Sequence, residues 1–268
     1  MVERKPVLTV PQPSKRAVAE QFGSVASAYA SSASHASGSD LSTLIDMLDL
    51  ESTMIALDVA TGPGHTAFAA GEHVRRVVGT DLAEGMIIQA RLLAAERGVQ
   101  NVEFLVMDAE NLEFPDGSFE IVTCRIAAHH FLDPERAVGE MARVLRPGGR
   151  LGLEDNIVPE DSSLDSFLNE LERLRDPVHV RAHSVAEWRE MLAGAGLLLD
   201  DLRFDRARHD VEAWLARTGI DESARDRVRE HLRAAKPSAC KHYLIEFDGD
   251  RPVSYTDDKV LLRAVKPL

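Results

Sequence analysis

The sequence predicts an α/β fold built on a doubly wound, mostly parallel seven-stranded sheet with helices on both faces. Apolar runs typical of buried strands alternate with helical patterns from residue 54 to residue 154. Such alternation favours a parallel sheet, because parallel strands need a long return connection, usually a helix. The 268 residues suit one such domain with an added subdomain, and 44% apolar residues suffice for a sizeable core.

Two helices and a loop are expected before the first strand. Apolar residues at helical spacing predict a helix over residues 15–30. Residues 31–39 are rich in Ser, Ala and Gly and are expected to form a loop. Asp40 is a candidate N-cap for a helix over residues 41–48.

Strands and helices then alternate up to residue 154. The expected strands cover residues 54–59, 76–80, 102–106, 119–124 and 151–154. The expected helices cover residues 66–71, 84–97 and 134–145. Gly98 suits a helix C-terminus, and Asp133 followed by Pro134 suits an N-cap and first helical position. Pro147-Gly148-Gly149 predicts a tight turn into the fifth strand.

The regular alternation of strands and helices ends after the fifth strand. An amphipathic, highly charged segment covers residues 162–175, and Ser184 with Glu187 predicts a capping box for a helix to residue 193. The expected last strands cover residues 197–204, 242–247 and 259–265. Two short helical pieces, expected within residues 211–235, form an insertion of the kind that often covers a ligand.

Charge and cysteine content exclude several classes of protein. A formal net charge of −13 argues against a nucleic-acid partner, because phosphate binding needs a basic face. Cys124 and Cys240 are the only cysteines, so neither a disulfide framework nor a metal site is expected. Residues 1–16 lack the apolar core of a signal peptide, and no run approaches a membrane span. We expect a cytoplasmic protein with no membrane partner.

The most informative stretch runs from Leu57 to Thr66, where a buried strand breaks into a Gly-rich turn before a helix. Glycine leaves the backbone open to a ligand and tolerates a positive φ. The spacing Gly62-x-Gly64-x-x-Ala67 matches the fingerprint of dinucleotide-binding, Rossmann-like folds. An NAD-dependent oxidoreductase is therefore one interpretation of this turn.

Three acids, one at or near the end of each of the first three strands, favour a different cofactor. Asp81 lies 19 residues after Gly62, where an acid grips ribose hydroxyls. Asp58 directly precedes the turn, where a pyrophosphate would be repelled and a cationic group attracted. Asp108, with Ala109 and Glu110 behind it, is placed to pair with an adenine edge. Together they indicate a cationic adenosine ligand, S-adenosylmethionine.

These motifs resemble those of class I methyltransferases, especially the branch similar to ubiquinone/menaquinone C-methyltransferases and other small-molecule methyltransferases. The matching pieces lie in order between Leu57 and Glu154 and include Gly79-Thr80-Asp81-Leu82 and Leu145-Arg146-Pro147-Gly148-Gly149. Ala60 departs from the usual first Gly of the loop, and Glu120 departs from the usual Asp before the fourth strand.

The resemblance implies roles for individual residues. The loop Ala60-Thr61-Gly62-Pro63-Gly64, with Asp58 behind it and Arg125 and Ile126 beside it, would hold the methionine part of S-adenosylmethionine. Asp81 would bind the ribose. The residues expected at the adenine are Leu82, Met86, Asp108, Ala109 and Glu110. The N-terminal helix would close over the cofactor, which makes Tyr29 and His35 candidates.

The resemblance also divides the chain by role. Residues 1–40 would form an arm and a lid helix, and residues 41–156 the S-adenosylmethionine-binding core. Residues 157–268 would supply helices over the substrate and strands that complete the same sheet. We expect a monomer or a homodimer.

His129, His130 and Asp155 are the catalytic candidates. The two histidines follow the fourth strand, where an acceptor would lie, and imidazole can take a proton from a hydroxyl or an amine. Sequence neighbours seldom point the same way, so at most one of the two is expected to face the site. Asp155 could orient such a histidine, with a solvated loop acid as the alternative. Glu154 is expected on the other strand face, in a structural role.

The expected reaction is in-line transfer of a methyl group to a small-molecule acceptor, with S-adenosylhomocysteine as product. O, N, C and S acceptors all remain open, as does a non-catalytic regulatory protein that binds S-adenosylmethionine. An anionic substrate is one interpretation of the cluster formed by Arg173, Arg175, His179, Arg181 and His183. A solvated charged face is the favoured one.

Overall fold

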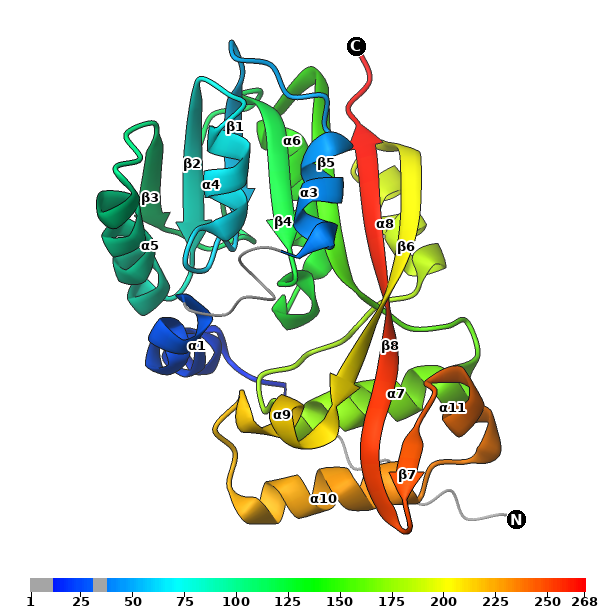
Figure 1. Cartoon of the computed structure of the whole chain (residues 1–268). Helices are drawn as coiled ribbons and strands as arrows, with labels where there is room; N and C mark the ends of the chain where they lie inside the picture. The colour runs from blue at the N-terminus through cyan, green and yellow to red at the C-terminus, as the bar shows by residue number, and fades with distance from the viewer. Residues whose placement is uncertain (1–11, 31–37) are drawn as a thin grey trace.

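The computed structural model describes residues 12–30 and 38–268, with residues 28–30 described by their backbone alone. Eight strands of these ranges form one sheet (Figure 1). They are β1 (Ile55–Val59), β2 (Arg76–Asp81), β3 (Val102–Val106), β4 (Phe119–Arg125), β5 (Leu145–Ile157), β6 (Leu198–Asp210), β7 (Glu246–Asp248) and β8 (Arg251–Val265).

The strand order is β3-β2-β1-β4-β5-β8-β6, with β7 beside β8. The pairs from β3 to β5 are parallel, whereas β8 runs antiparallel to its neighbours β5, β6 and β7. The predicted doubly wound, mostly parallel sheet is therefore confirmed. Its seven principal strands are present, and the short β7 is an eighth.

Helices cover both faces of the sheet. They are α1 (Lys15–Ala30), α3 (Ser39–Asp46), α4 (His65–Gly71), α5 (Glu84–Arg97), α6 (Pro134–Val144), α7 (Ser162–Arg175), α8 (Val185–Gly194), α9 (Val211–Ala216), α10 (Glu222–Arg233) and α11 (Pro237–His242). Buried side chains of α3, α4 and α5 share one core with the sheet, and those of α6 and α8 share another. Such two-sided burial is what an all-apolar parallel strand requires.

Local signals place several helix ends where the sequence predicts them. The Asp133 carboxylate accepts the Arg136 N–H at 2.9 Å and caps α6, with Pro134 at its first position. Ser184 and Glu187 form the reciprocal capping box of α8. Gly98 ends α5 at a φ of 67°, a left-handed conformation that glycine adopts without strain.

Two predictions are wrong, one about the N-cap of α3 and one about the turn before β5. Asp40 does not cap α3, because the helix begins at Ser39 and Asp40 lies inside it, buried against Arg125. Pro147-Gly148-Gly149 does not precede the fifth strand, because β5 already begins at Leu145. The three residues form an irregularity in the β4–β5 pairing, and a Cβ on Gly149 would lie 2.9 Å from two carbonyl oxygens.

The C-terminal strands differ most from expectation. β6 and β8 are both much longer than predicted and extend together below the rest of the sheet (Figure 1). The expected strand over residues 242–247 is largely absent, because α11 ends at His242 and β7 starts at Glu246. Tyr255 in the extended part of β8 belongs to a third core, made mainly by α7, α9, α10 and α11.

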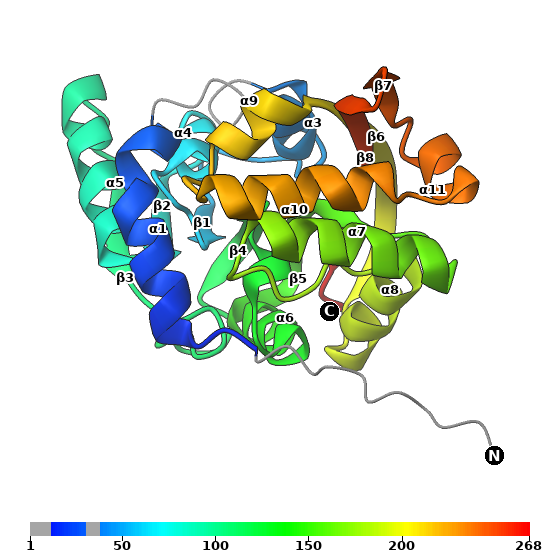
Figure 2. The ribbon, with the colours of Figure 1, turned by 90° about the horizontal axis from the view of Figure 1, so that it is seen from below.

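The chain reverses direction across the sheet between β1 and β4. β1 pairs with both β2 and β4, so the chain winds outward to β3 and then returns to the other side of β1. Ligands of such sheets bind beyond the carboxyl ends of the strands at this reversal. Seen from that end, α1, α7, α9 and α10 lie across the strand ends (Figure 2). No helix of the described residues is both long and apolar enough to cross a membrane.

Candidate functional site

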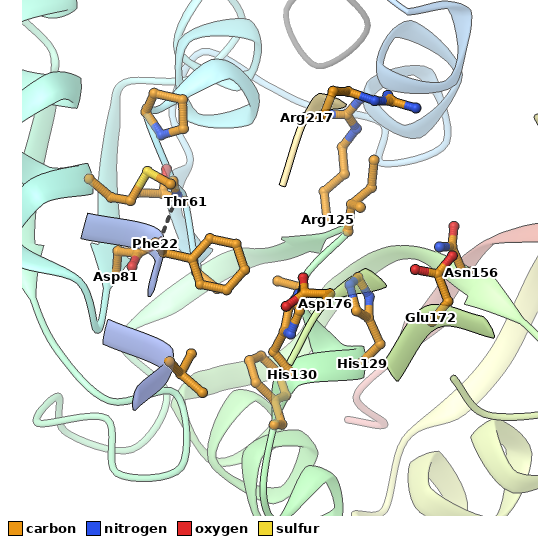
Figure 3. A pocket seen from close by; sticks show the side chains of 18 of the residues that line it. Phe22, Thr61, Asp81, Arg125, His129, His130, Asn156, Glu172, Asp176 and Arg217 are labelled. Atoms are coloured by element: carbon orange, nitrogen blue, oxygen red, sulfur yellow. Dashed lines mark hydrogen bonds and ion pairs between the residues drawn. The ribbon is translucent and has the colours of Figure 1, made fainter. Parts of the chain in front are cut away.

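A cavity of about 660 Å³ lies beyond the carboxyl ends of the strands (Figure 3). Its loop half is lined by residues 58–62, 81–86 and 107–110, which follow or end β1, β2 and β3. Its insertion half is lined by α7, by residues 207–217 and by residues 257–259. The loop after β4 lies between the two halves. Cavities of this size are typical of small-molecule and cofactor sites.

The Gly-rich turn has a strained, well-anchored backbone. Ala60, Gly62 and Gly64 all have positive φ, at 53°, 54° and 94°. The Thr61 N–H donates to the Thr80 carbonyl at 2.8 Å, which ties the turn to β2. A Cβ on Gly62 would meet no protein atom within 4 Å, so the backbone there is open to the cavity.

Gly64 has a different place from the one predicted. It does not line the cavity, and a Cβ on it would lie 2.8 Å from the Phe104 ring. Its positive φ and this close approach both require glycine. Gly64 therefore packs α4 against the sheet, behind the turn that faces the cavity.

Asp81 joins the turn to the end of β2. Its carboxylate accepts the Gly62 N–H at 2.9 Å and the Ala83 N–H at 2.8 Å. Burial raises the pKa of Asp81 to about 6, although the two backbone donors favour the charged form. Each carboxylate oxygen has a further lone pair, so Asp81 can still accept hydrogen bonds from a ligand in the cavity.

Asp58 lies beneath the turn and is 1% exposed. It accepts the Thr61 hydroxyl at 2.5 Å and the Thr123 hydroxyl at 2.7 Å. Burial raises the pKa of Asp58 to about 6. The two hydroxyls hold this carboxylate at the base of the cavity, where it acts as a fixed acceptor.

Helix α1 bridges the acids after β3. Lys15 of α1 places its ammonium 2.5 Å from Asp108 Oδ2 and 2.6 Å from Glu110 Oε2. Glu110 also accepts the N–H groups of Leu132 and Asp133, and so joins this loop to the start of α6. The bridge holds α1 over this part of the loop half. Leu82, Met86, Met107 and Ala109 supply apolar surface nearby.

A buried ion network lies behind the cavity wall. Arg125 at the end of β4 donates through Nε to Glu154 at 2.8 Å and lies 3.2 Å from Asp40. Lys259 of β8 lies 3.4 Å from Glu154 and 3.5 Å from Asp40. Burial raises the pKa of Glu154 to about 7, whereas Asp40, despite burial, has a pKa lowered to about 2 by a hydrogen bond with Glu154 and by the two cations. Arg125 and Lys259 both line the cavity.

His129 is held in the short 3₁₀ turn η1 (Ala128–His130) by a carboxylate. Its Nδ1 lies 2.5 Å from Asp155 Oδ1, and its backbone N–H donates to Asp155 Oδ2 at 3.0 Å. Burial opposes a charged ring, but the Asp155 carboxylate outweighs it and raises the pKa of His129. Because Nδ1–H donates to Asp155, the Nε2 lone pair of the neutral ring is available to a ligand. Asp155 itself does not line the cavity.

His130 also lines the cavity, so the expectation that at most one of the pair faces it is wrong. The two rings lie 4.1 Å apart in a turn with three residues per turn, where neighbours are not opposed as in a strand. His130 Nδ1 lies 3.0 Å from the Val178 carbonyl oxygen, and the ring meets Phe22 of α1 edge-on at 4.7 Å. Burial and His129 lower the pKa of His130 to about 4.

The basic cluster before α8 lies mostly outside the cavity. Arg181 pairs with Asp165 and Glu187, and Arg173 pairs with Glu170. His179 is buried against Asn169. Of the cluster, Arg175 alone is among the described residues that line the cavity. The interpretation as an anionic-substrate site therefore fails for the cluster as a whole.

The remaining candidates divide into those described and those not. Ala60, Thr61, Leu82, Met86, Ala109 and Ile126 all line the cavity. The Tyr29 side chain and the whole of His35 lie outside the described residues. In the ranges that the structure describes, no group of His, Cys, Asp or Glu could hold a metal ion.

Sequence reasoning missed the side chains of the insertion half. They are Asn156, Glu172, Asp176, His209, Arg217 and Asp257. The break in rhythm after β5 predicts helices that cover a ligand. It does not say which of their polar side chains turn inward.

Comparisons with known proteins agree on one family. A family model described as a methyltransferase domain matches residues 57–153. The chain is 37% identical over 246 residues to an uncharacterized methyltransferase, YcgJ of Bacillus subtilis, covering 91% of this chain and 97% of that protein. The crystal structure of YcgJ matches with a TM-score of 0.84 over 85% of this chain and 98% of that chain.

Two further proteins extend this similarity. The crystal structure of BH2331 from Bacillus halodurans is 37% identical, with a TM-score of 0.84 over 86% of this chain and 100% of that one. The 27-O-demethylrifamycin SV methyltransferase of Amycolatopsis mediterranei is 30% identical over 227 residues, which is 84% of this chain and 81% of that protein.

Proposed function

Because this chain belongs to the class I S-adenosylmethionine-dependent methyltransferases, we propose that it methylates a hydroxyl group of a small molecule, with His129 as the base. One observation carries the proposal. His129, fixed by Asp155 at 2.5 Å, lies between the loop half and the insertion half of the cavity. The relative named for 27-O-demethylrifamycin SV supports an oxygen acceptor.

The loop half suits the cofactor. Asp81 accepts the ribose hydroxyls, while Leu82 and Met86 contact the adenine ring. Asp108 and Ala109 bind the adenine edge, with Glu110 supporting their loop. The open backbone at Gly62, with Ala60 and Thr61, holds the methionine part. The carboxylate of the methionine part pairs with Arg125, which lies beside Ile126. The amino group of the methionine part is held by Asp58 directly or through water.

The proposed chemistry needs alignment first and a base second. Bound S-adenosylmethionine supplies a methyl group on a sulfonium, which leaves with the bonding electron pair as S-adenosylhomocysteine. His129 Nε2 takes the hydroxyl proton as the acceptor oxygen forms its bond to the methyl carbon. Asp155 stabilises the imidazolium that results. Alignment supplies on the order of 7–11 kcal/mol of the barrier, and a base typically adds about 10²–10⁴-fold.

His130 and the covering elements have supporting roles in this proposal. His130 stays neutral at physiological pH, and its contact with Phe22 links the site to the lid. In this proposal α1 is the lid helix of residues 1–40, residues 41–156 are the cofactor core, and residues 157–268 supply the cover over the acceptor. Enclosure on these sides keeps water from the methyl group.

Two measurements test the proposal. Calorimetry should detect binding of S-adenosylhomocysteine to the protein and no binding of NADH. Radiolabelled methyl from S-adenosylmethionine should appear on members of a panel of phenols and alcohols, and less on thiols and amines of matched shape. Binding without any transfer to a hydroxyl acceptor would remove the acceptor and base assignments and leave the cofactor assignment intact.

A further inference from the structure

The insertion half of the cavity carries several polar and charged side chains among its apolar ones, such as Trp214. Its walls carry the side chains of Asn156, Glu172 and Arg217, which Figure 3 shows. Arg175, His209 and Asp257 line it as well. Asp257 is 2% exposed, and its Oδ1 has no hydrogen-bond partner in the part of the chain that the structure describes. A buried carboxylate oxygen without a donor is costly, so this end of the cavity is suited to a polar ligand.

Arg217 differs from the other cations that line the cavity. Each of the others lies within ion-pair distance of a carboxylate: Lys15 with Asp108, Arg125 and Lys259 with Glu154, Arg175 with Glu172, and Arg208 with Glu246. The ion pairs found within residues 12–30 and 38–268 give Arg217 no carboxylate. Its one hydrogen bond in those ranges joins Nη2 to His209 Nδ1 at 3.3 Å.

A chain of hydrogen bonds from the buried Asp257 through the partly buried His209 holds the exposed Arg217 at the cavity mouth. His209 Nε2 lies 3.0 Å from Asp257 Oδ2, so the ring donates this proton to the carboxylate. Nδ1 then carries the lone pair that accepts the Arg217 N–H. The His209 ring packs against the Tyr255 ring, with 4.9 Å between the ring centroids. A guanidinium has five N–H donors, and this arrangement uses one.

We propose that Arg217 binds a carboxylate of the acceptor molecule, while the acceptor hydroxyl lies at His129. This inference rests on the proposed function and names its substrate class, a small hydroxy acid. The planar guanidinium matches the two oxygens of a carboxylate. A doubly charged phosphate fits less well, because Glu172, Asp176 and Asp257 line the same half.

The test compares acids with neutral analogues of the same shape. The probes are 4-hydroxybenzoate with 4-hydroxybenzamide and 4-hydroxycinnamate with its amide, titrated by ligand-observed NMR into protein saturated with S-adenosylhomocysteine. In the natural protein at least one acid should bind about tenfold more tightly than its amide, as expected for one charge-assisted hydrogen-bond pair. Arg217→Gln should remove this preference, and Arg217→Lys should retain part of it.

The matched control is Arg227→Gln, which removes the same charge from an exposed arginine of α10 whose side chain bonds to Ser223. It should keep the full preference. The inference is overturned if no acid binds more tightly than its amide, absence of binding included, or if the preference survives in Arg217→Gln. Failure of the natural protein to bind S-adenosylhomocysteine in calorimetry would instead overturn the proposed function.

Discussion

The two halves of the cavity hold their polar groups in different ways. In the loop half, Asp81 is held by the backbone N–H groups of Gly62 and Ala83, and the lining segments lie at or just beyond the ends of β1, β2 and β3. In the insertion half, Arg217 is held by His209, which is held by Asp257, three side chains from separate stretches of the chain. One half is fixed by main-chain geometry and the other by contacts between side chains.

The difference has a physical origin. A ligand common to a whole family can be bound by the sheet itself, because strand ends and their turns meet at one edge whatever the rest of the sequence. A ligand particular to one protein needs side chains that can change without disturbing the sheet. The insertion has its own apolar core, which lets its surface vary independently.

The largest effect is expected where the two halves meet. His129→Ala should lower kcat by about 10²–10⁴-fold on a hydroxyl acceptor, because the hydroxyl proton loses its base. In the natural protein kcat/KM should fall as pH drops through the pKa of His129, which lies above its ordinary value. Labelled-methyl transfer across the pH range measures both.

The control is His73→Asn, which changes an exposed histidine and should leave the pH profile as it is. Asp155→Asn should move the acid limb to lower pH, because the ring keeps its burial and loses the carboxylate that raises its pKa. If the acid limb of the pH profile stays in place in Asp155→Asn, a group other than His129 causes it.

The second effect tests whether side-chain pairs also hold the wall behind the loop half. Arg125→Met should lower the free energy of unfolding by about 3 kcal/mol, because it leaves the buried Asp40 and Glu154 with Lys259 as their one remaining cation among the residues that the structure describes. Urea denaturation measures this. Arg146→Met, which breaks a half-exposed pair with Glu120, should cost about 1 kcal/mol or less. Equal losses of unfolding free energy in the two variants would argue that breaking a buried ion pair costs no more than breaking an exposed one.

The third effect concerns Asp81, the main acceptor of the loop half. Asp81→Asn should weaken S-adenosylhomocysteine binding about 10–100-fold in calorimetry, because hydrogen bonds to a charged acceptor are lost. In the natural protein binding should weaken as pH falls through about 6, where Asp81 becomes neutral. The variant should lose the part of that step due to Asp81 and keep the part due to Asp58, whose pKa is also raised to about 6, whereas Asp116→Asn, at an 80% exposed side chain, should retain the whole step.

Sequence predicted the loop half far better than the insertion half. Asp58, Asp81 and Asp108 could be found because each follows or ends a strand, and parallel strands bring those ends together. Asp40 was misread as a cap, since its true partner Arg125 lies 85 residues away and no local rule connects them. The sequence predicts Gly64 at the methionine part of the cofactor, whereas the structure requires glycine there because of Phe104. That contact depends on how β3 packs and could not be predicted from the turn itself.

The insertion half shows why the other site residues could not be predicted from the sequence. The lengths of β6 and β8 depend on their pairing with each other beyond the sheet, which alternation within either strand does not reveal. His209 and Asp257 belong to this extension, and Arg217 follows the helix packed on it. Their meeting is a property of the tertiary fold, so it could not be predicted from spacing.

The smallest effect is expected at Lys15, the α1 side chain that forms ion pairs with two acids of the loop half. Its ammonium bridges Asp108 and Glu110 but is 39% exposed, so each ion pair is worth about 0.2–1 kcal/mol. Lys15→Met loosens α1 and also frees Asp108 for the adenine edge, and these consequences oppose each other in affinity. In the rate of release we expect the looser α1 to dominate, because the cofactor product can leave only when α1 moves away from the loop half.

Lys15→Met should therefore speed S-adenosylhomocysteine release about two- to fivefold in stopped-flow measurements, with a smaller change in affinity. Added salt should speed release from the natural protein and have less effect on the variant, because the bridge it screens is already gone. Arg16→Met, which breaks the exposed pair with Glu20 on the same helix, should release at the natural rate. Equal acceleration in both variants would show that α1 responds to helix stability, and that the lid, like the insertion half, depends on packing rather than on one charged contact.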